Sequence, residues 1–75
     1  MKAGTLLLIL HDVIEGLVSI GILDQDGNFK SPNLNDDVKI YNMVAECLKR
    51  RGYVEPEEVH KVMSALPFVM SIVRQ

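Results

Sequence analysis

Apolar residues recur with helical spacing over most of the first twenty positions of the chain. From about Thr5 to Ile20, one face of a helix with about 100° per residue collects these side chains: Leu6, Ile9, Leu10, Val13, Leu17 and Ile20. Leu7, Ile14 and Val18 widen the stripe well beyond the roughly 100° that a core-facing helix needs. The pattern predicts a first helix that must be covered from two sides, with Gly16 permitting a close helix crossing.

A second helix is predicted from about Asp36 to Arg51, with signals at both ends. Asn33 or Asn35 can cap its N-terminus. Its last turn is basic, which opposes the negative helix end, and Gly52 suits the left-handed position that follows a helix. Its apolar side has Met43 at the edge and consists of Ile40, Tyr41, Val44, Cys47 and Leu48.

A third helix is predicted to begin at Pro56, because proline fits the first helical position and Glu57 and Glu58 suit the positive first turn. Its apolar stripe is Val59, Val62, Met63, Leu66, Val69, Met70 and Val73. Pro67 lacks a backbone N–H, so we expect a kink there. Together the three segments predict a mainly α fold, a small three-helix bundle with a short hairpin or loop between the first two helices.

Residues 22–30, ILDQDGNFK, lie between the first two predicted helices. Asp-Gly between short extended runs is typical of a hairpin, since a type I′ turn needs positive φ at both central positions. This pattern predicts a turn at Asp26 and Gly27, with arms at 22–25 and 28–31. An irregular loop is the alternative.

The same segment begins like a calcium-binding loop. Asp24, Asp26 and Asn28 fit the first three ligand positions of an EF-hand. The rest departs from the pattern, because Phe29 occupies the glycine position and Asn35 the position of the bidentate carboxylate. We expect no metal or other cofactor, and a calcium-responsive binding protein that uses Asp24, Asp26 and Asn28 is an alternative function.

Composition limits the class of protein further. A chain of 75 residues forms one domain, 1–75, and its 48% hydrophobic and 24% charged residues indicate a globular protein. One cysteine excludes an internal disulfide, so stability must come from packing or self-association. The net charge of −2 gives no general attraction to nucleic acid or to anionic lipid.

The N-terminal apolar run, Leu6 to Leu10, ends at His11 and Asp12 and is too short for a signal peptide or a membrane span. We therefore expect a soluble, cytoplasmic protein with no membrane partner.

Catalytic and metal-binding patterns are weak. His11 and Glu15 share a helix face at i and i+4, but a metal site needs further donors, and His60 could supply one only through tertiary contact. We interpret the pair as solvated. Cys47 lies on an apolar side, where a free cysteine is commonly a buried hydrophobe. We expect no enzymatic activity.

The basic triplet at 49–51, with a turn and a further helix, resembles a helix-turn-helix in outline. Glu55, Glu57 and Glu58 would then face phosphates at the end that usually reads bases. We expect no nucleic-acid partner, and a small DNA-binding regulator stays an alternative function.

The C-terminal segment indicates an interaction surface. Phe68 and Ile72 point away from the third stripe, with Ala65 beside them, unless Pro67 rotates the last turns and returns Phe68 to the core. Exposed apolar side chains that lie together mark such a surface, and we assign to it Leu7, Ile14, Val18, Ala65, Phe68 and Ile72. The predicted function is a non-catalytic protein–protein interaction module. It associates with itself as a homodimer or higher oligomer, or it is a small regulator that masks a different protein.

Overall fold

Three helices make up the fold. The computed structural model describes residues 1–26, 28, 30 and 36–73, without the side chains of Asp36, Met70, Ile72 and Val73. The helices are α1 (Ala3–Ser19), α2 (Asp36–Arg50) and α3 (Pro56–Val73). The predicted fold class, a mainly α three-helix bundle, is confirmed. Among the described residues, no helix combines the length and apolar character that a membrane crossing requires.

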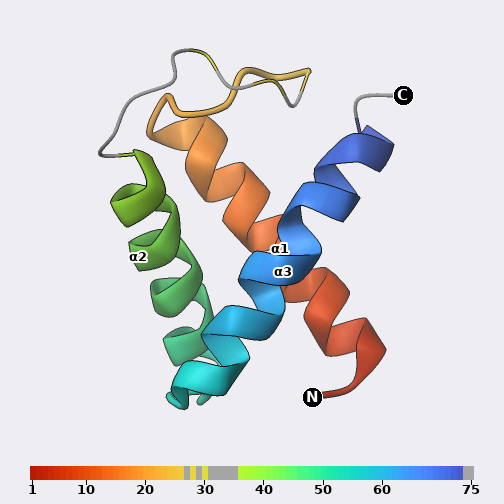
Figure 1. The fold of residues 1–75 in the computed structure, drawn as a ribbon, viewed down its shortest axis with the longest axis vertical. Coiled ribbons are helices and arrows are strands. Elements are labelled where there is room, and N and C mark those ends of the chain that lie inside the picture. The colour runs from red at the N-terminus through yellow and green to blue at the C-terminus, as the bar shows by residue number, and fades with distance from the viewer. Residues whose placement is uncertain (27, 29, 31–35, 74–75) are drawn as a thin grey trace.

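The helices cross rather than run in parallel. Figure 1 shows α3 lying obliquely across the middle of α1, with α2 beside them on the left. Every pair of helices is in contact. Beyond the crossing, the N-terminal half of α1 and the C-terminal half of α3 diverge on the side away from α2 (Figure 1). That side is therefore not covered by α2.

Side chains from the three predicted apolar stripes form most of the core. The buried hydrophobic side chains are Ile9, Leu10, Val13, Leu17, Ile22, Leu23, Ile40, Val44, Cys47, Leu48, Val59, Val62 and Leu66. Two assignments to the apolar faces are wrong, because Ile20 is 51% exposed and Tyr41 is also exposed. Tyr41, on the predicted apolar side of α2, is 42% exposed. Ile20 is exposed because of the way in which α1 ends.

The chain leaves α1 through a left-handed glycine. Gly21 has φ +83°, and its N–H donates to the Val18 carbonyl at 3.1 Å. The Ile22 N–H donates to the Leu17 carbonyl at 2.9 Å. These two bonds form a Schellman motif, in which the residue after the glycine packs back on the last turn. Ile22 therefore takes the place in the core that periodicity assigned to Ile20.

The end of α2 repeats this arrangement. Gly52 has φ +85° and donates to the Lys49 carbonyl at 3.0 Å, and the Tyr53 N–H donates to the Leu48 carbonyl at 3.0 Å. The predicted role of Gly52 is confirmed. Arg51 follows the helix instead of ending it, and its Nη2 lies 3.1 Å from Asp12 Oδ2 on α1. This ion pair connects the residue after α2 to α1.

Gly16, which the sequence predicts at a helix crossing, lies against the Met43 side chain of α2. A Cβ atom placed on Gly16 would lie 2.5 Å from the Met43 sulfur, well inside van der Waals contact. Met43 is half-buried against the core at this crossing. The glycine thus makes room for the methionine side chain.

Pro67 lies inside α3 without ending it, and the helix continues to Val73. Phe68, the next residue, is 71% exposed. The alternative in which the proline returns Phe68 to the core is therefore excluded.

The connection after α1 turns back on itself, but in a different register from the predicted hairpin. The Asp24 N–H donates to the Asn28 carbonyl at 2.9 Å, and the Lys30 N–H donates to the Ile22 carbonyl at 3.0 Å. A two-residue turn at Asp26 and Gly27 would instead have paired Gln25 with Asn28, so that register is wrong. Gly27, Phe29 and 31–35 lie outside the described residues.

Candidate functional site

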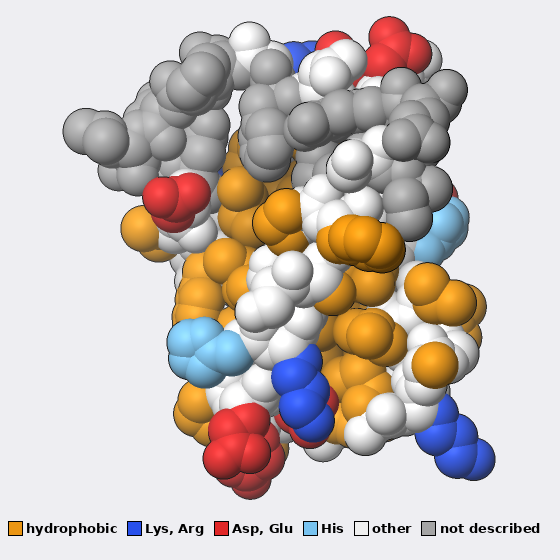
Figure 2. Space-filling model, turned by 45° about the vertical axis from the view of Figure 1, so that its right-hand side comes forward, with side chains coloured by type: hydrophobic (Ala, Val, Ile, Leu, Met, Phe, Trp, Pro, Cys, Tyr) orange, Lys and Arg blue, Asp and Glu red, His pale blue; other side chains and the backbone are white. Residues whose placement is uncertain are grey.

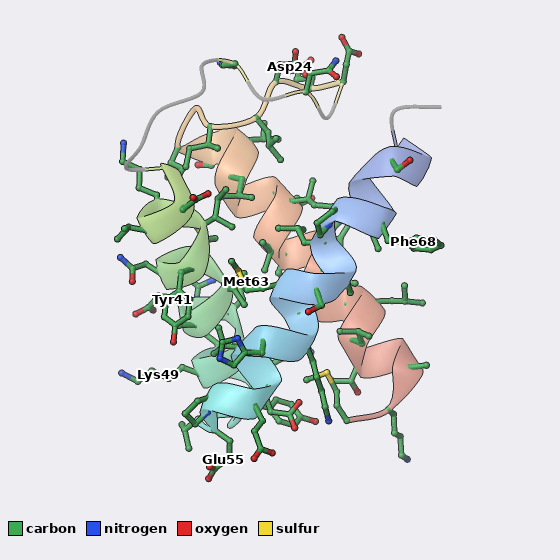
Figure 3. All side chains as sticks on the ribbon, viewed as in Figure 1. Asp24, Tyr41, Lys49, Glu55, Met63 and Phe68 are labelled. Carbon is green, nitrogen blue, oxygen red and sulfur yellow. The ribbon has the colours of Figure 1, made fainter. Side chains whose placement is uncertain are left out.

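An apolar surface lies where α1 and α3 diverge (Figure 2). Figure 2 shows this side of the molecule, with hydrophobic side chains gathered in the middle of the face and charged side chains around its lower edge. Single exposed hydrophobic residues are ordinary, whereas a contiguous group marks an interaction surface. Phe68 on α3 is 71% exposed and Leu7 on α1 is 62% exposed. In Figure 3 the Phe68 ring points outward, away from the bundle.

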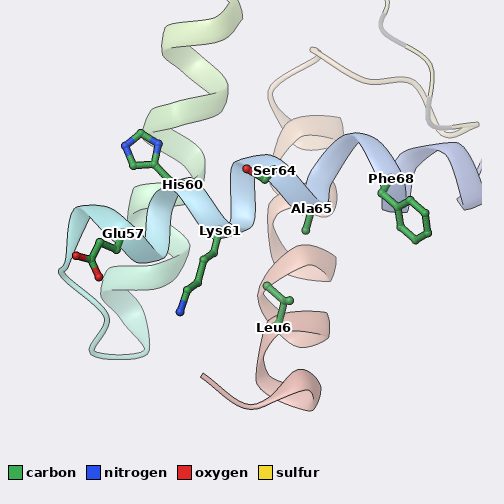
Figure 4. A pocket seen from close by; sticks show the side chains of 7 residues that line it. All are labelled: Leu6, Glu57, His60, Lys61, Ser64, Ala65 and Phe68. Atoms are coloured by element: carbon green, nitrogen blue, oxygen red, sulfur yellow. The ribbon is translucent and has the colours of Figure 1, made fainter.

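A hollow lies beside Phe68, between α3 and the first turns of α1. We call it the α1–α3 hollow, and its lining residues are Leu6, Glu57, His60, Lys61, Ser64, Ala65 and Phe68. In Figure 4, Leu6 from α1 lies below Ala65 of α3, with Phe68 at one end and Glu57 at the other. The hollow is therefore apolar near Phe68 and polar toward the start of α3.

Lys61 borders the polar end of the hollow. Its Nζ lies 3.7 Å from Glu58 Oε1, one turn earlier on α3, and its side chain is 60% exposed. The second carboxylate oxygen of Glu58 is buried and has no hydrogen-bond partner among the described residues. Long basic side chains commonly lay their methylene groups on apolar surface while the charge stays in water. Lys61 can therefore contact an apolar group that enters the hollow.

The six residues predicted for an interface differ in exposure. Leu7 and Phe68 are exposed, as that role requires. Ile14, Val18 and Ala65 are half-buried and pack against the core, so each offers only part of its surface. The side chain of Ile72 lies outside the described set. Their role in binding stays a prediction.

Sequence reasoning missed Leu6 and Lys61 as lining residues. Leu6 falls on the predicted core stripe, but it lies so near the N-terminus that it is only half-buried. Periodicity predicts the face of the helix on which a side chain lies. It does not predict whether another helix covers that part of the face. Two features of the sequence could have indicated that Leu6 is only partly covered: its position in the first turns of α1 and the width of the apolar stripe.

Asp24, the first candidate calcium ligand, is engaged by the backbone of its own turn. Its Oδ1 accepts the N–H of Asp26 and the N–H of Asn28, both at 2.9 Å. An aspartate that bonds to the backbone two residues later is a common way to hold a turn. Asp24 therefore has a structural role in the turn, and calcium binding stays an untested alternative. Residues 31–35, which carry the closing positions of a calcium loop, lie outside the described residues.

The other candidate metal residues include one close pair on α1. His11 Nε2 lies 3.4 Å from Glu15 Oε1 on the exposed face of α1, as the spacing predicted. Within the part of the chain that the structure describes, no three His, Cys, Asp or Glu side chains come together in a metal-binding group. His60 lines the α1–α3 hollow, where its lining neighbours include Lys61 and Ser64.

Cys47 is buried in the core between apolar neighbours. Burial raises the pKa of the Cys47 thiol, and the nearby charge of Arg50 opposes this shift only in part. A cysteine with a raised pKa carries little of the reactive thiolate at neutral pH. Its surroundings are those of a packing residue.

Two of the three basic residues at 49–51 lie in the last turn of α2, and the third forms an ion pair with α1. Lys49 and Arg50 lie in the last turn, where they favour the negative helix end. Arg51 bonds Asp12. The next helix begins with Glu57 and Glu58 in its first turn. Each of the three basic residues thus has a local role at the end of α2, and binding to DNA stays an untested alternative.

Comparison of the chain with protein-family models, with curated proteins and with solved structures finds no match. The fold and the described surface define the class of the protein: a small three-helix bundle with an apolar face and an adjoining hollow between α1 and α3.

Proposed function

We propose that this chain is a non-catalytic protein-interaction module that associates with itself through the apolar face of α1 and α3. The observation that carries the proposal is the exposure of Phe68, at 71%, beside the α1–α3 hollow. Removing one phenylalanine side chain from water stabilises a complex by about 1.5–3 kcal/mol. A two-fold interface uses each such residue twice.

The size of the chain supports the same proposal. A domain of 75 residues buries only about 60–65% of the surface that its unfolded chain exposes, so its stability margin is small. Small domains without a disulfide or a metal commonly gain stability from association. An apolar face that is covered in a dimer would add to the single core formed by the three helices.

A pair of charged substitutions tests the proposal. Phe68→Glu should shift the chain to the monomer, because a carboxylate in an apolar interface loses its hydration without a partner. The matched control is Val38→Glu on α2, since Val38 is also exposed, at 60%, but lies on a different helix. Light scattering reports the mass of each variant, and circular dichroism reports its helical content.

The expected result is a monomeric Phe68→Glu variant and a Val38→Glu variant that associates like the native chain, both fully helical. Equal masses for the two variants, with intact helices, would contradict the assignment of this surface.

A further inference from the structure

We propose that the interface is an antiparallel pair of α3 helices in which Phe68 of each copy enters the α1–α3 hollow of the other. This inference rests on the proposed self-association and adds the orientation of the copies and their contacts. Three features of the molecule support it: the lining of the hollow, the spacing of residues along α3 and the charges on that helix.

The lining of the hollow suits an aromatic group. Leu6 and Ala65 offer apolar surface, and Lys61 borders the same space. A lysine ammonium within about 6 Å of a ring centre is attracted to the face of the ring. Phe68 stands at the rim with most of its ring in solvent, so it leaves its own hollow open. The surface thus carries both a hollow and a side chain that fits one, as a two-fold interface requires.

The spacing of residues on α3 brings these groups together. The midpoint between Ser64 and Ala65 is also the midpoint between Lys61 and Phe68 along the sequence. If a two-fold axis passes through that point, antiparallel copies of α3 place each Phe68 opposite the partner's Lys61. Ser64 and Ala65 have small side chains, and helix axes can approach to about 8 Å where the contacting side chains are small.

The charges on α3 favour the antiparallel orientation. In a parallel pair, Glu57, Glu58 and Lys61 would each lie beside the same residue of the other copy. Like charges that lie directly beside each other repel. The antiparallel pair separates them, because the acidic first turn then lies opposite the C-terminal turns of the other α3, around Ser71. It also makes the two helix dipoles antiparallel, which is the favourable orientation for helices that pack side by side.

Single cysteine substitutions distinguish these orientations. At an axis separation of about 8–10 Å, with Cα atoms about 2.3 Å from each axis, facing Cα atoms lie about 3.5–5.5 Å apart, which a disulfide can bridge. Ser64→Cys, next to the axis, should therefore give a disulfide-linked dimer under mild oxidation. Lys61→Cys should not, because its two copies would be displaced along the helices by about 10 Å. Cys47 is buried, so the native chain serves as the uncrosslinked control.

The outcomes separate this inference from the proposed function. Crosslinking of Ser64→Cys alone supports the antiparallel pair. Crosslinking of both variants would mean a parallel pair, and crosslinking of neither in a chain of dimeric mass would mean a different surface. Both results overturn the inference and leave self-association standing. A native chain that stays monomeric overturns both, and a different protein or a lipid surface would then be the occupant to test.

Lys61→Gln gives a second readout that does not depend on crosslinking. It keeps most of the side chain and removes the charge, so two ring contacts worth about 0.5–1 kcal/mol each would be lost and the dimer should weaken about 5- to 30-fold. Lys39→Gln, on the exposed surface of α2, is the matched control and should leave the dissociation constant unchanged. Equal constants for the two variants would contradict the contact between Lys61 and Phe68.

Discussion

At Gly16 on α1, one added methyl group would collide with the sulfur of Met43 on α2. Alanine in a helix is favoured over glycine by about 1 kcal/mol, whereas crowding a packed site costs about 1–3 kcal/mol. We therefore expect Gly16→Ala to leave the free energy of unfolding unchanged or lower. In a Met43→Ala background the collision is gone, and the same change should raise this free energy by about 1 kcal/mol. Urea denaturation of the four chains measures the coupling.

Gly4→Ala is the control for Gly16→Ala, because a Cβ atom at Gly4 has no atom within 4 Å. Its effect should be the same with and without Met43. If Gly16→Ala also has the same effect in both backgrounds, the contact between Gly16 and Met43 is wrong.

Asp24 holds the turn after α1 with one oxygen atom that accepts two backbone N–H groups. Asp24→Ala should lower the free energy of unfolding by about 1 kcal/mol, since net hydrogen bonds are worth about 0.5–1.5 kcal/mol each and this site is exposed. Asp24→Asn keeps an oxygen acceptor and should lose less. Urea denaturation compares the two, and equal losses would show that the carboxylate acts in another way.

α1 and α2 both end in a Schellman motif, in which a left-handed glycine is followed by a residue that packs back on the helix. Non-glycine residues reach this backbone conformation at a cost of about 1–2 kcal/mol. Gly21→Ala and Gly52→Ala should each lower the free energy of unfolding by about that amount. Thermal or urea unfolding followed by circular dichroism measures the change.

Asparagine provides the control at both positions, because it tolerates left-handed backbone better than alanine. A Cβ atom at Gly21 or Gly52 would meet no atom within 4 Å, so the expected loss comes from the backbone alone. If the alanine variants are as stable as the native chain, the two Schellman motifs do not hold the helix ends.

The sequence predicted the three helices because their apolar stripes repeat with the helical period and their ends carry proline, acidic residues or glycine. It misplaced Ile20 because periodicity was extended one residue past Ser19, although Gly21 gave the same signal that identified Gly52. The register of the next turn was wrong for a local reason. The Asp24 side chain selects a longer connection, and an Asp-Gly pair alone does not reveal that bond.

For the molecule as a whole, the sequence predicted a surplus of apolar surface but not its place. The width of the first stripe indicated that α1 needs cover on two sides. Only the crossing of α1 and α3 decides which residues stay outside, and that crossing depends on contacts far apart in the chain. As a result, Ile14 and Val18 are half-buried while Leu7 is exposed. The hollow is likewise formed by Leu6 and residues more than fifty positions later.

Self-association is the property on which the proposed function depends, and the solution mass of the native chain tests it most directly. Light scattering on a sizing column, at several loading concentrations, gives that mass without a label. One chain has a mass of 8.4 kDa. We expect the measured mass to rise with concentration toward twice that value or above. A mass of 8.4 kDa at every concentration would contradict self-association through the face of α1 and α3.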